Sequence, residues 1–344
     1  MEPVLAAAVR TALAQWKQAN TFDERVVQLA NPSLVVAALG PVAEQALRGA
    51  GSEPDAIRRH VLGRPFFHLK EVFDASEKVD TPTAFTPVPE TEATVDARAA
   101  ALVVHAVLKL ETVSYSTEND GELFVNLVVM PGKGRFADKS KSGMRGHTDG
   151  VSFPLRGDDD AEDPRIAPSP DVVTLMGLRN PSDVATTVMS LDDVLARMTA
   201  EDVFELKKRQ FSMNSQLTFA QGMAELLNEP LVAHGEAVLT DRAEGTYVRY
   251  SHKNVMPTDP NAARPREASN NFAVACNAAA QDVVVKPGDV LVVSNRLCLH
   301  GRAEPGVEAG GRTRWLLRTY GLDTSNLNPQ KRHLGERPTY VLYP

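Results

Sequence analysis

The later two thirds of the sequence consist largely of short runs of β-branched and aliphatic residues that alternate with turn signals. Turn-forming pairs such as Pro131-Gly132, Asn180-Pro181 and Pro287-Gly288 separate the runs. Many short strands divided in this way are typical of a β-sandwich or a β-barrel. The runs that we interpret as strands are 122–130, 171–179, 185–191, 246–252, 272–278, 282–295 and 313–322.

Helical patterns precede and interrupt these strands. The first 50 residues are rich in Ala and Leu, with apolar residues at helical spacing. A Pro- and Thr-rich loop at 79–93 comes before a helix that Thr94 or Asp96 would cap. The expected helices lie within 1–50 and at 54–63, 94–110 and about 191–228.

These patterns together predict an α+β fold. We expect one domain over 1–344, with a mainly helical N-terminal part over 1–95 and a β core over about 100–325 that carries a helical insert at about 191–228. A chain of this length can bury a substantial core.

Charge and composition exclude several classes of function. The net charge of −7 argues against nucleic acid or a membrane surface as partner, because such binders carry a basic field. No apolar run reaches the roughly 20 residues that span a bilayer, and the acidic start at Glu2 is unlike a signal peptide. Cys276 and Cys298 form no disulfide framework. We expect a cytoplasmic protein that acts on a small molecule, and homo-oligomer formation stays open.

Two His-x-acid pairs are candidates for a metal site. With 8 His and 44 acidic residues in 344, about one such pair is expected by chance, so context has to separate His147-Thr148-Asp149 from His234-Gly235-Glu236. Side chains at i and i+2 of a strand share a face, and His300 follows in a later strand. Two imidazoles and one carboxylate on one side of a metal suit non-haem iron. The alternative for each histidine is a hydrogen-bonded core or surface residue.

The run 313–322 carries two arginines that we expect to point the same way. On a strand, Arg314 and Arg318 share one face with Leu316 and Tyr320, and apolar residues occupy the other face, so both faces are covered. A buried guanidinium without a partner is costly. A carboxylate ligand would supply the missing charge. The alternative is a pair of salt bridges to acids elsewhere in the chain.

The segments 146–150, 286–302 and 312–320, in this order, resemble the Fe(II)/2-oxoglutarate-dependent dioxygenases. They are most similar to the clavaminate synthase-like branch, which includes amino-acid hydroxylases, and the match covers about 100–325. The resemblance implies a double-stranded β-helix (jelly-roll) core, with Fe(II) and 2-oxoglutarate as cofactors and molecular oxygen as co-substrate.

The resemblance also implies a role for individual residues. His147, Asp149 and His300 correspond to the catalytic iron ligands. Arg314 corresponds to the arginine that holds 2-oxoglutarate, and Thr186 to a threonine that contacts it, with Thr187 as second choice. Arg318 corresponds to an arginine that meets the substrate's carboxylate in related amino-acid hydroxylases. Ser142, which precedes the triad, and Ser251 and Asn254 are further candidates for the substrate pocket, and ordinary loop polarity is the alternative for the last two.

The sequence departs from the pattern of the branch at two places. The carboxylate ligand is Asp149 where the branch often has Glu. Relatives that hydroxylate arginine carry acids in the segment that corresponds to 247–260, whereas the nearest acid here is Asp259, slightly too late. Ser251, His252 and Asn254 occupy the segment instead.

The resulting expectation is hydroxylation of a free L-amino acid, with a basic one such as L-lysine as first choice. Desaturation, cyclisation or hydroxylation of another amino-acid-derived metabolite is the alternative within the same class. A non-catalytic metal-binding β-barrel module is the alternative from another class. The acidic run 158–163 is interpreted as a solvated surface loop.

Overall fold

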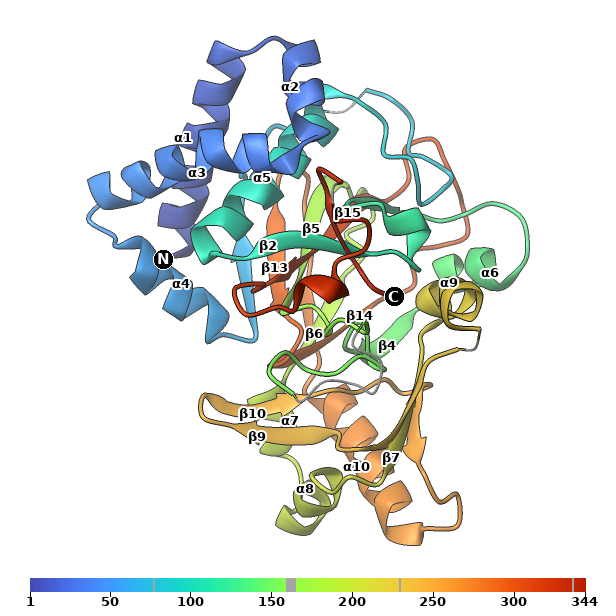
Figure 1. The fold of residues 1–344 in the computed structure, drawn as a ribbon. Coiled ribbons are helices and arrows are strands. Elements are labelled where there is room, and N and C mark those ends of the chain that lie inside the picture. The colour runs from blue at the N-terminus through green and yellow to red at the C-terminus, as the bar shows by residue number, and fades with distance from the viewer. Residues whose placement is uncertain (77, 159–164, 229, 336) are drawn as a thin grey trace.

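The computed structural model describes residues 1–344 except 77, 159–164, 229 and 336. Helices form the N-terminal part and gather on one side of the molecule (Figure 1). A loop without helix or strand covers 79–91 and leads into α5, the most completely buried of these helices. The helices of this part are α1 Glu2–Ala19, α2 Phe22–Leu29, α3 Pro32–Gly49, α4 Pro54–Leu62 and α5 Glu92–Leu108.

Helix α5 begins earlier than the sequence predicted. Thr91 caps it, because its hydroxyl accepts from the backbone N–H of Thr94 while the Thr94 side chain accepts from the backbone of Thr91. Asp96 is instead an ion-pair partner of Lys17 at 2.7 Å and of Arg25 at 3.2 Å. The predicted cap at Thr94 or Asp96 was therefore wrong by one turn, because Asp96 fastens α5 to the helices around it.

The largest sheet runs in the order β1-β13-β5-β15-β2-β16, with β3 also paired to β15. Its neighbouring strands are antiparallel except β16, which is parallel to β2. We call it the major sheet. Its strands are β1 Phe66–Leu69, β2 Glu111–Tyr115, β3 Val125–Leu127, β5 Val172–Arg179, β13 Val290–Ser294, β15 Trp315–Leu322 and β16 Tyr340–Leu342.

A second sheet, which we call the minor sheet, runs in the order β12-β6-β14-β4. A core cluster takes residues from both sheets, including Val188 and Cys298 from the minor sheet and Leu175 and Leu316 from the major sheet. The two sheets therefore bury one face each against the other. The strands of the minor sheet are β4 Met144–His147, β6 Thr186–Ser190, β12 Gln281–Val283 and β14 Cys298–Arg302.

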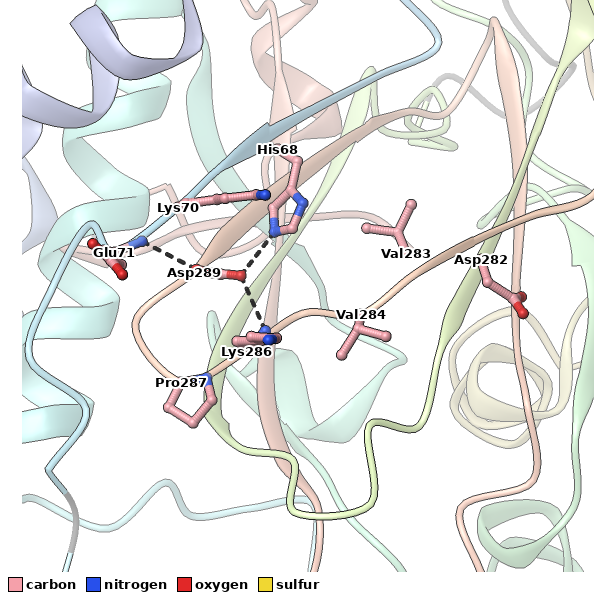
Figure 2. A pocket seen from close by; sticks show the side chains of 9 residues that line it. All are labelled: His68, Lys70, Glu71, Asp282, Val283, Val284, Lys286, Pro287 and Asp289. Atoms are coloured by element: carbon pink, nitrogen blue, oxygen red, sulfur yellow. Dashed lines mark hydrogen bonds and ion pairs between the residues drawn. The ribbon is translucent and has the colours of Figure 1, made fainter.

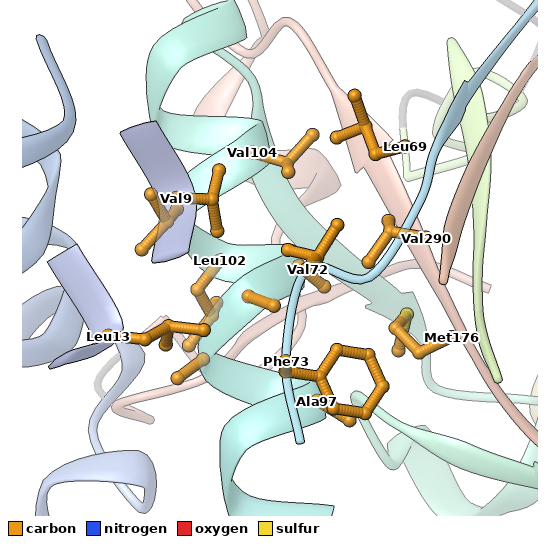
Figure 3. Packing of buried hydrophobic residues seen from close by; sticks show 14 of the residues in the cluster. Val9, Leu13, Leu69, Val72, Phe73, Ala97, Leu102, Val104, Met176 and Val290 are labelled. Atoms are coloured by element: carbon orange, nitrogen blue, oxygen red, sulfur yellow. The ribbon is translucent and has the colours of Figure 1, made fainter. Parts of the chain in front are cut away.

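The N-terminal helices cover the outer face of the major sheet. Residues of α1 and α5, such as Leu13 and Leu102, form one cluster with sheet residues such as Met176 and Val290, and all of them are nearly inaccessible to solvent (Figure 3). Trp315 and Leu317 belong to this cluster, whereas Leu316 and Tyr320 belong to the cluster between the sheets. The prediction that the 313–322 strand is covered on both faces is confirmed.

The helical insert is longer and more mixed than the sequence predicted. It runs from 191 to 278 and contains a three-stranded sheet, β11-β7-β8, and a hairpin, β9-β10. Most of it forms the lower part of the molecule in Figure 1, whereas α9 lies higher, near α6. Its elements are α7 Leu191–Leu195, α8 Ala200–Leu206, β7 Phe211–Asn214, α9 Leu217–Leu227, β8 Val232–Glu236, β9 Leu239–Arg242, β10 Gly245–Val248, β11 Val255–Pro257 and α10 Ala263–Ala278.

The strand predicted at 272–278 was wrong, because these residues end helix α10. Ala268, Phe272, Ala275 and Cys276 are buried, and their spacing is helical rather than alternating. They pack α10 into the hydrophobic cluster of the insert. The window 272–278 alone is too short to separate the two periods.

Three shorter elements complete the described fold: η1 Asn119–Gly121, α6 Arg135–Lys141 and η2 Pro329–Lys331. No single helix among the described residues is long and apolar enough to cross a membrane. Only α2 and α3 taken together are long and apolar enough to do so, and these two helices meet at a bend of 110°.

His105 joins helix α5 to the major sheet. One ring nitrogen lies 2.8 Å from the Thr112 hydroxyl on β2, and the other lies 2.8 Å from the Thr174 hydroxyl on β5. The side chain is fully buried, and this burial lowers the pKa of His105 from 6.5 to about 3. The imidazole is therefore neutral in the folded protein.

This burial predicts a loss of stability in acid. Because the pKa of His105 is lower in the folded state, the unfolded chain binds the proton more strongly between about pH 6.5 and 3, and stability falls as the pH drops through this window. At pH 5 the loss from this residue is about 2 kcal/mol relative to neutral pH. Urea unfolding of the wild type and of His105→Gln at pH 7.5 and pH 5 measures it. We expect the acid-induced loss to be about 2 kcal/mol smaller in the variant, and equal losses would refute the assignment.

Candidate active site

Three potential metal ligands meet at the edge of the minor sheet. Strand β14 pairs antiparallel with β4, and His300 lies directly opposite His147 in this register. The Nε2 atom of His147 lies 3.5 Å from one Asp149 carboxylate oxygen, and Nε2 of His300 lies 3.7 Å from the other. One ligand atom from each of the three buried side chains lies within 4.8 Å of the others. Among the described residues this is the one such group, and it is the predicted triad.

The position of Asp149 beside the two histidines has a structural cause that the sequence did not predict. It lies in a turn beyond the end of β4, so strand alternation does not place it. Asn295 holds it there: the Asn295 side chain accepts from the backbone N–H of Asp149 at 2.8 Å and donates to its carbonyl oxygen at 2.8 Å. Asn295 is a positioning residue that sequence reasoning missed, because no motif links it to a residue 146 positions earlier.

The protonation of the triad suits a divalent metal. Burial opposes ionisation of Asp149, but hydrogen bonds from His147 and His300 outweigh it and hold its pKa well below the ordinary value. Burial, together with the charge of His147, lowers the pKa of His300. The Nδ1 atom of His147 lies 2.9 Å from the Arg145 carbonyl, to which it donates, so Nε2 is the ring nitrogen that faces Asp149 and is available to a metal. An ionised carboxylate and neutral imidazoles are the forms that bind metal.

Arg314 lies just before β15 and is 5% exposed. No hydrogen-bond or ion-pair partner lies within reach of its guanidinium in the described part of the chain, and its Nε is buried without a partner. Burial, with the charge of Arg302 as second cause, lowers the pKa of Arg314 to about 9. The structure therefore leaves a buried cation whose desolvation no described residue offsets.

Thr186 shares the inner face of the minor sheet with the metal ligands. On β6 it lies opposite Arg302, and Val188 lies opposite His300. Directly opposed residues of an antiparallel pair project to the same side. The Thr186 side chain is buried. It therefore belongs to the wall that carries His300, whereas Thr187, its neighbour, projects to the other face.

Arg318 differs from Arg314 because it has an acidic partner. Its Nη2 atom lies 2.7 Å from Oε2 of Glu118, and its Nη1 atom lies 4.0 Å from Oδ2 of Asp149. Burial opposes the charge of Arg318, but Glu118 outweighs it and raises the pKa of the guanidinium. The expectation of two arginines without acidic partners was wrong for Arg318. Glu118 was missed because it lies 200 residues away in an irregular segment.

The other predicted substrate residues are distributed unevenly. Ser251 is buried and forms a β-bridge with His147, and the Asn254 amide donates to its hydroxyl at 3.3 Å. Both therefore lie beside the triad. Ser142 is exposed, and its hydroxyl donates to the Asp138 carbonyl at 2.9 Å. The structure gives the Ser142 side chain a local capping role instead of bringing it to the triad.

The second His-x-acid pair has structural partners. His234 and Glu236 lie on β8, outside the triad. Nδ1 of His234 lies 3.0 Å from the Ser212 hydroxyl, and Glu236 pairs with Arg249. These contacts account for both side chains without a metal.

A separate pocket lies beside the turn between β12 and β13 (Figure 2). Asp289 accepts there from the backbone N–H groups of Glu71 and Lys286, and one of its oxygens lies 2.9 Å from Nε2 of His68. None of the predicted site residues lines this pocket. These contacts fasten the turn to β1.

Comparison with solved structures identifies the fold. The non-heme iron oxygenase OrfP, in complex with Fe and alpha-ketoglutaric acid, matches 99% of this chain and 98% of its own with a TM-score of 0.70 at 21% identity. An asparagine oxygenase in complex with Fe(II), 3-hydroxyasparagine and succinate matches 94% of this chain and 96% of its own with a TM-score of 0.69 at 20% identity. This chain has the iron-oxygenase fold.

Sequence comparison gives a weaker match, to a protein named as an amino-acid hydroxylase. An L-ornithine/L-arginine 3-hydroxylase from Catenulispora acidiphila is 26% identical over 224 residues, which are 59% of this chain and 61% of that protein. The chain thus matches less than two thirds of that relative's length. No family model matches the sequence. The resemblance recognised from the sequence motifs is confirmed, because the structural neighbours are oxygenases of this type that act on amino acids.

Within this iron-oxygenase fold, we predict that His300→Ala abolishes tight binding of Fe(II). Loss of a ligand should weaken binding by more than the roughly 10- to 100-fold typical of residues outside the ligand set. Anaerobic titration with Fe(II) measures the change. His234→Ala is the matched control and should leave the affinity within about twofold, because its ring already has a structural partner. A larger effect at His234 than at His300 would exclude the assigned site.

Proposed function

We propose that this chain is an Fe(II)- and 2-oxoglutarate-dependent oxygenase that hydroxylates an amino acid. The observation that carries the proposal is the buried triad His147, Asp149 and His300 beside Arg314, a buried cation without a partner among the described residues. A metal ion accounts for the triad, and a diacid with one carboxylate at Arg314 accounts for the arginine.

The donor set fits iron rather than a closed structural site. Two imidazoles and one carboxylate leave further coordination positions for cosubstrate and oxygen. His147, Asp149 and His300 would hold the iron, Arg314 would hold the distal carboxylate of 2-oxoglutarate, and Thr186 would donate a hydrogen bond to the same diacid. When bound, iron and 2-oxoglutarate supply the oxidation: molecular oxygen converts 2-oxoglutarate to succinate and CO2, and its second atom becomes the substrate's hydroxyl group.

The paired charges of Arg318 and Glu118 fit the head group of an amino acid. The guanidinium is a partner for the α-carboxylate. The Oε1 atom of Glu118 is buried and accepts no hydrogen bond from the described residues, so it is a ready acceptor for the α-ammonium group. Both side chains are largely buried, 13% and 3% exposed, so they would hold a zwitterion in one orientation beside the metal.

The next question is which side chain the amino-acid substrate carries. The relatives named above act on arginine, ornithine and asparagine, and none of them supports lysine, the first choice from the sequence. Ser251, His252 and Asn254 lie beside His147 where acids would suit a cation. A basic side chain therefore stays a prediction, and the acidic run 158–163 that could attract one lies mostly outside the described residues.

The proposal also covers the type of β fold, the number of domains and the alternative reactions. We propose that the major and minor sheets are the two walls of a jelly-roll, and that the whole chain works as one domain because the helices share a core with the major sheet. Desaturation or cyclisation remains the alternative outcome at the same site. A non-catalytic metal-binding barrel is disfavoured, because it has no use for a buried, unpaired Arg314. A cytoplasmic location and a homo-oligomer remain predictions.

Succinate release tests the proposal directly. The purified protein, loaded with Fe(II) and 2-oxoglutarate in air, is offered each common amino acid, with arginine, ornithine and asparagine first. We expect substrate-dependent succinate and a product that has gained one oxygen atom. A product that has lost two hydrogens would establish desaturation instead. Bound iron without succinate for any amino acid would overturn the proposed reaction.

We further predict that Arg314→Gln weakens the use of 2-oxoglutarate. Removing one partner of a buried charge pair should raise the KM for 2-oxoglutarate by roughly 30-fold or more. The exposed Arg312, two residues earlier, provides the control Arg312→Gln, which should change this KM by less than about twofold. Steady-state kinetics at saturating amino acid give both values, and an unchanged KM in Arg314→Gln would contradict the role given to this arginine.

A further inference from the structure

The turn that carries Asp149 is held by two buried side-chain amides. Asn295 bonds to the backbone N–H and carbonyl of Asp149 itself. Gln216, which is 8% exposed, bonds to the residues on either side. Its Oε1 atom accepts from the backbone N–H of Gly150 at 2.8 Å, and its Nε2 atom donates to the carbonyl oxygen of Thr148 at 3.1 Å. Two amides from distant parts of the chain therefore meet at the backbone of the one acidic residue in the triad.

The four bonds together restrain the direction of the Asp149 side chain. Peptide groups are planar, so the direction of a side chain depends on the two dihedral angles between the planes before and after it. In the plane before Asp149, Gln216 bonds the carbonyl and Asn295 bonds the N–H. In the plane after Asp149, Asn295 bonds the carbonyl and Gln216 bonds the N–H. Both planes are thus held at both ends, and loss of either amide would leave each plane held at one end only.

Gln216 belongs to the insert, where it is the N-cap residue of α9. Its backbone carbonyl accepts from the N–H groups of Phe219 and Ala220, each at 2.9 Å. Its side chain forms no capping bond to the described N–H groups of α9. Asn, Asp and Ser are preferred at such a position, because their short side chains can bond the first N–H groups of the helix. The longer side chain of Gln216 instead reaches the turn at Asp149.

Helix α9 is anchored beside the candidate site, and this fixes the base of the Gln216 side chain. Phe219 packs edge-on against Tyr115 at the end of β2, with their ring centroids 5.7 Å apart. Gly222 approaches the following turn so closely that a Cβ atom there would lie 2.6 Å from the Thr117 carbonyl oxygen. Thr117 directly precedes Glu118, the partner of the β15 arginine. One helix of the insert therefore contacts both the turn of Asp149 and the segment of Glu118.

We propose that Gln216 is a positioning residue that, together with Asn295, directs the Asp149 carboxylate toward the metal. The inference rests on the metal site of the proposed function and extends it, because it makes the affinity for metal depend on a residue of the insert. The Asp149 oxygens lie 3.5 Å from Nε2 of His147 and 3.7 Å from Nε2 of His300. A ligand set of this kind has to be held to within roughly 0.5 Å by the groups around it.

The test compares Gln216→Asn with Gln210→Asn in the full-length protein. Asn is one methylene shorter than Gln, so it should lose the bonds to the turn, and as a preferred N-cap residue it should preserve α9. Gln210 lies in the same insert, and its amide donates to the Glu205 carbonyl at 2.8 Å. We expect Gln216→Asn to raise the Kd for Co(II) by roughly 10- to 100-fold, and Gln210→Asn to change it by less than about twofold.

Co(II) is the probe because it suits the same donor set and its visible absorption bands report both binding and coordination geometry. Titration of each variant, followed by absorption, gives the Kd. Gln216→Met keeps the length of the side chain but removes both hydrogen bonds, so it should show a loss of similar size. The conclusion then does not depend on the folding of a single variant.

A second background separates positioning from general damage to the fold. In Asp149→Ala the ligand that Gln216 positions is missing, so the addition of Gln216→Asn should raise the Kd for Co(II) by less than about threefold further. An unchanged Kd in Gln216→Asn, an equal rise in Gln210→Asn, or the same rise with and without the Asp149 carboxylate would overturn the assignment. Failure of the wild type to bind Co(II) would instead overturn the metal site of the proposed function, and this assignment with it.

Discussion

The pairing of β14 with β4 is the interaction on which the rest of the site depends. It sets His300 opposite His147, although the two residues come from segments 153 positions apart in the chain. A slip by one residue would turn His300 away from the inner face and bring Leu299 or Gly301 to the metal. Gly301 keeps this register tight, because a Cβ atom there would lie 2.3 Å from the Met144 carbonyl. The same strand then places Arg302 against Thr186 and against the end of α6. One register therefore fixes the three candidate metal ligands, Thr186 and the end of α6.

Several buried polar groups around this register lack hydrogen-bond partners among the described residues. Buried polar atoms are nearly always hydrogen-bonded. Here Arg314 Nε, Glu118 Oε1, His300 Nδ1 and the Tyr320 hydroxyl are buried without partners among the described residues. Each such group costs stability in the free protein and lowers the cost of binding, because a ligand finds its partners already desolvated and oriented. The buried His105, which satisfies both ring nitrogens with threonine hydroxyls, is the contrast within the same fold.

The sequence predicted the features that depend on neighbouring residues or on a short motif. It located most strands of both sheets, the N-terminal helices, the triad and Arg314, because alternation, turn residues and a pair such as His147 and Asp149 are visible within a few residues. It could not locate Glu118 or Asn295, whose contacts join residues far apart in the sequence. It misread 272–278, since Ala and Val fit both periods in a short window. It also assumed that both arginines of β15 were without acidic partners, and a strand pattern cannot reveal that Glu118 reaches Arg318.

The candidate site is built mainly from the two sheets, and the insert contributes Ser251 to it. The candidate triad, Arg314 and Arg318 lie on or beside strands of the two sheets, so the β core fixes their relative positions. Ser251 comes from the insert and reaches the site through one bridge to His147, next to a bond from the Thr148 N–H to the Tyr250 carbonyl. The insert packs on its own hydrophobic cluster, which touches the core through Met189 and Leu299 on the outer face of the minor sheet. Changes in the insert would therefore alter the surroundings of Ser251 without changing the register of β14.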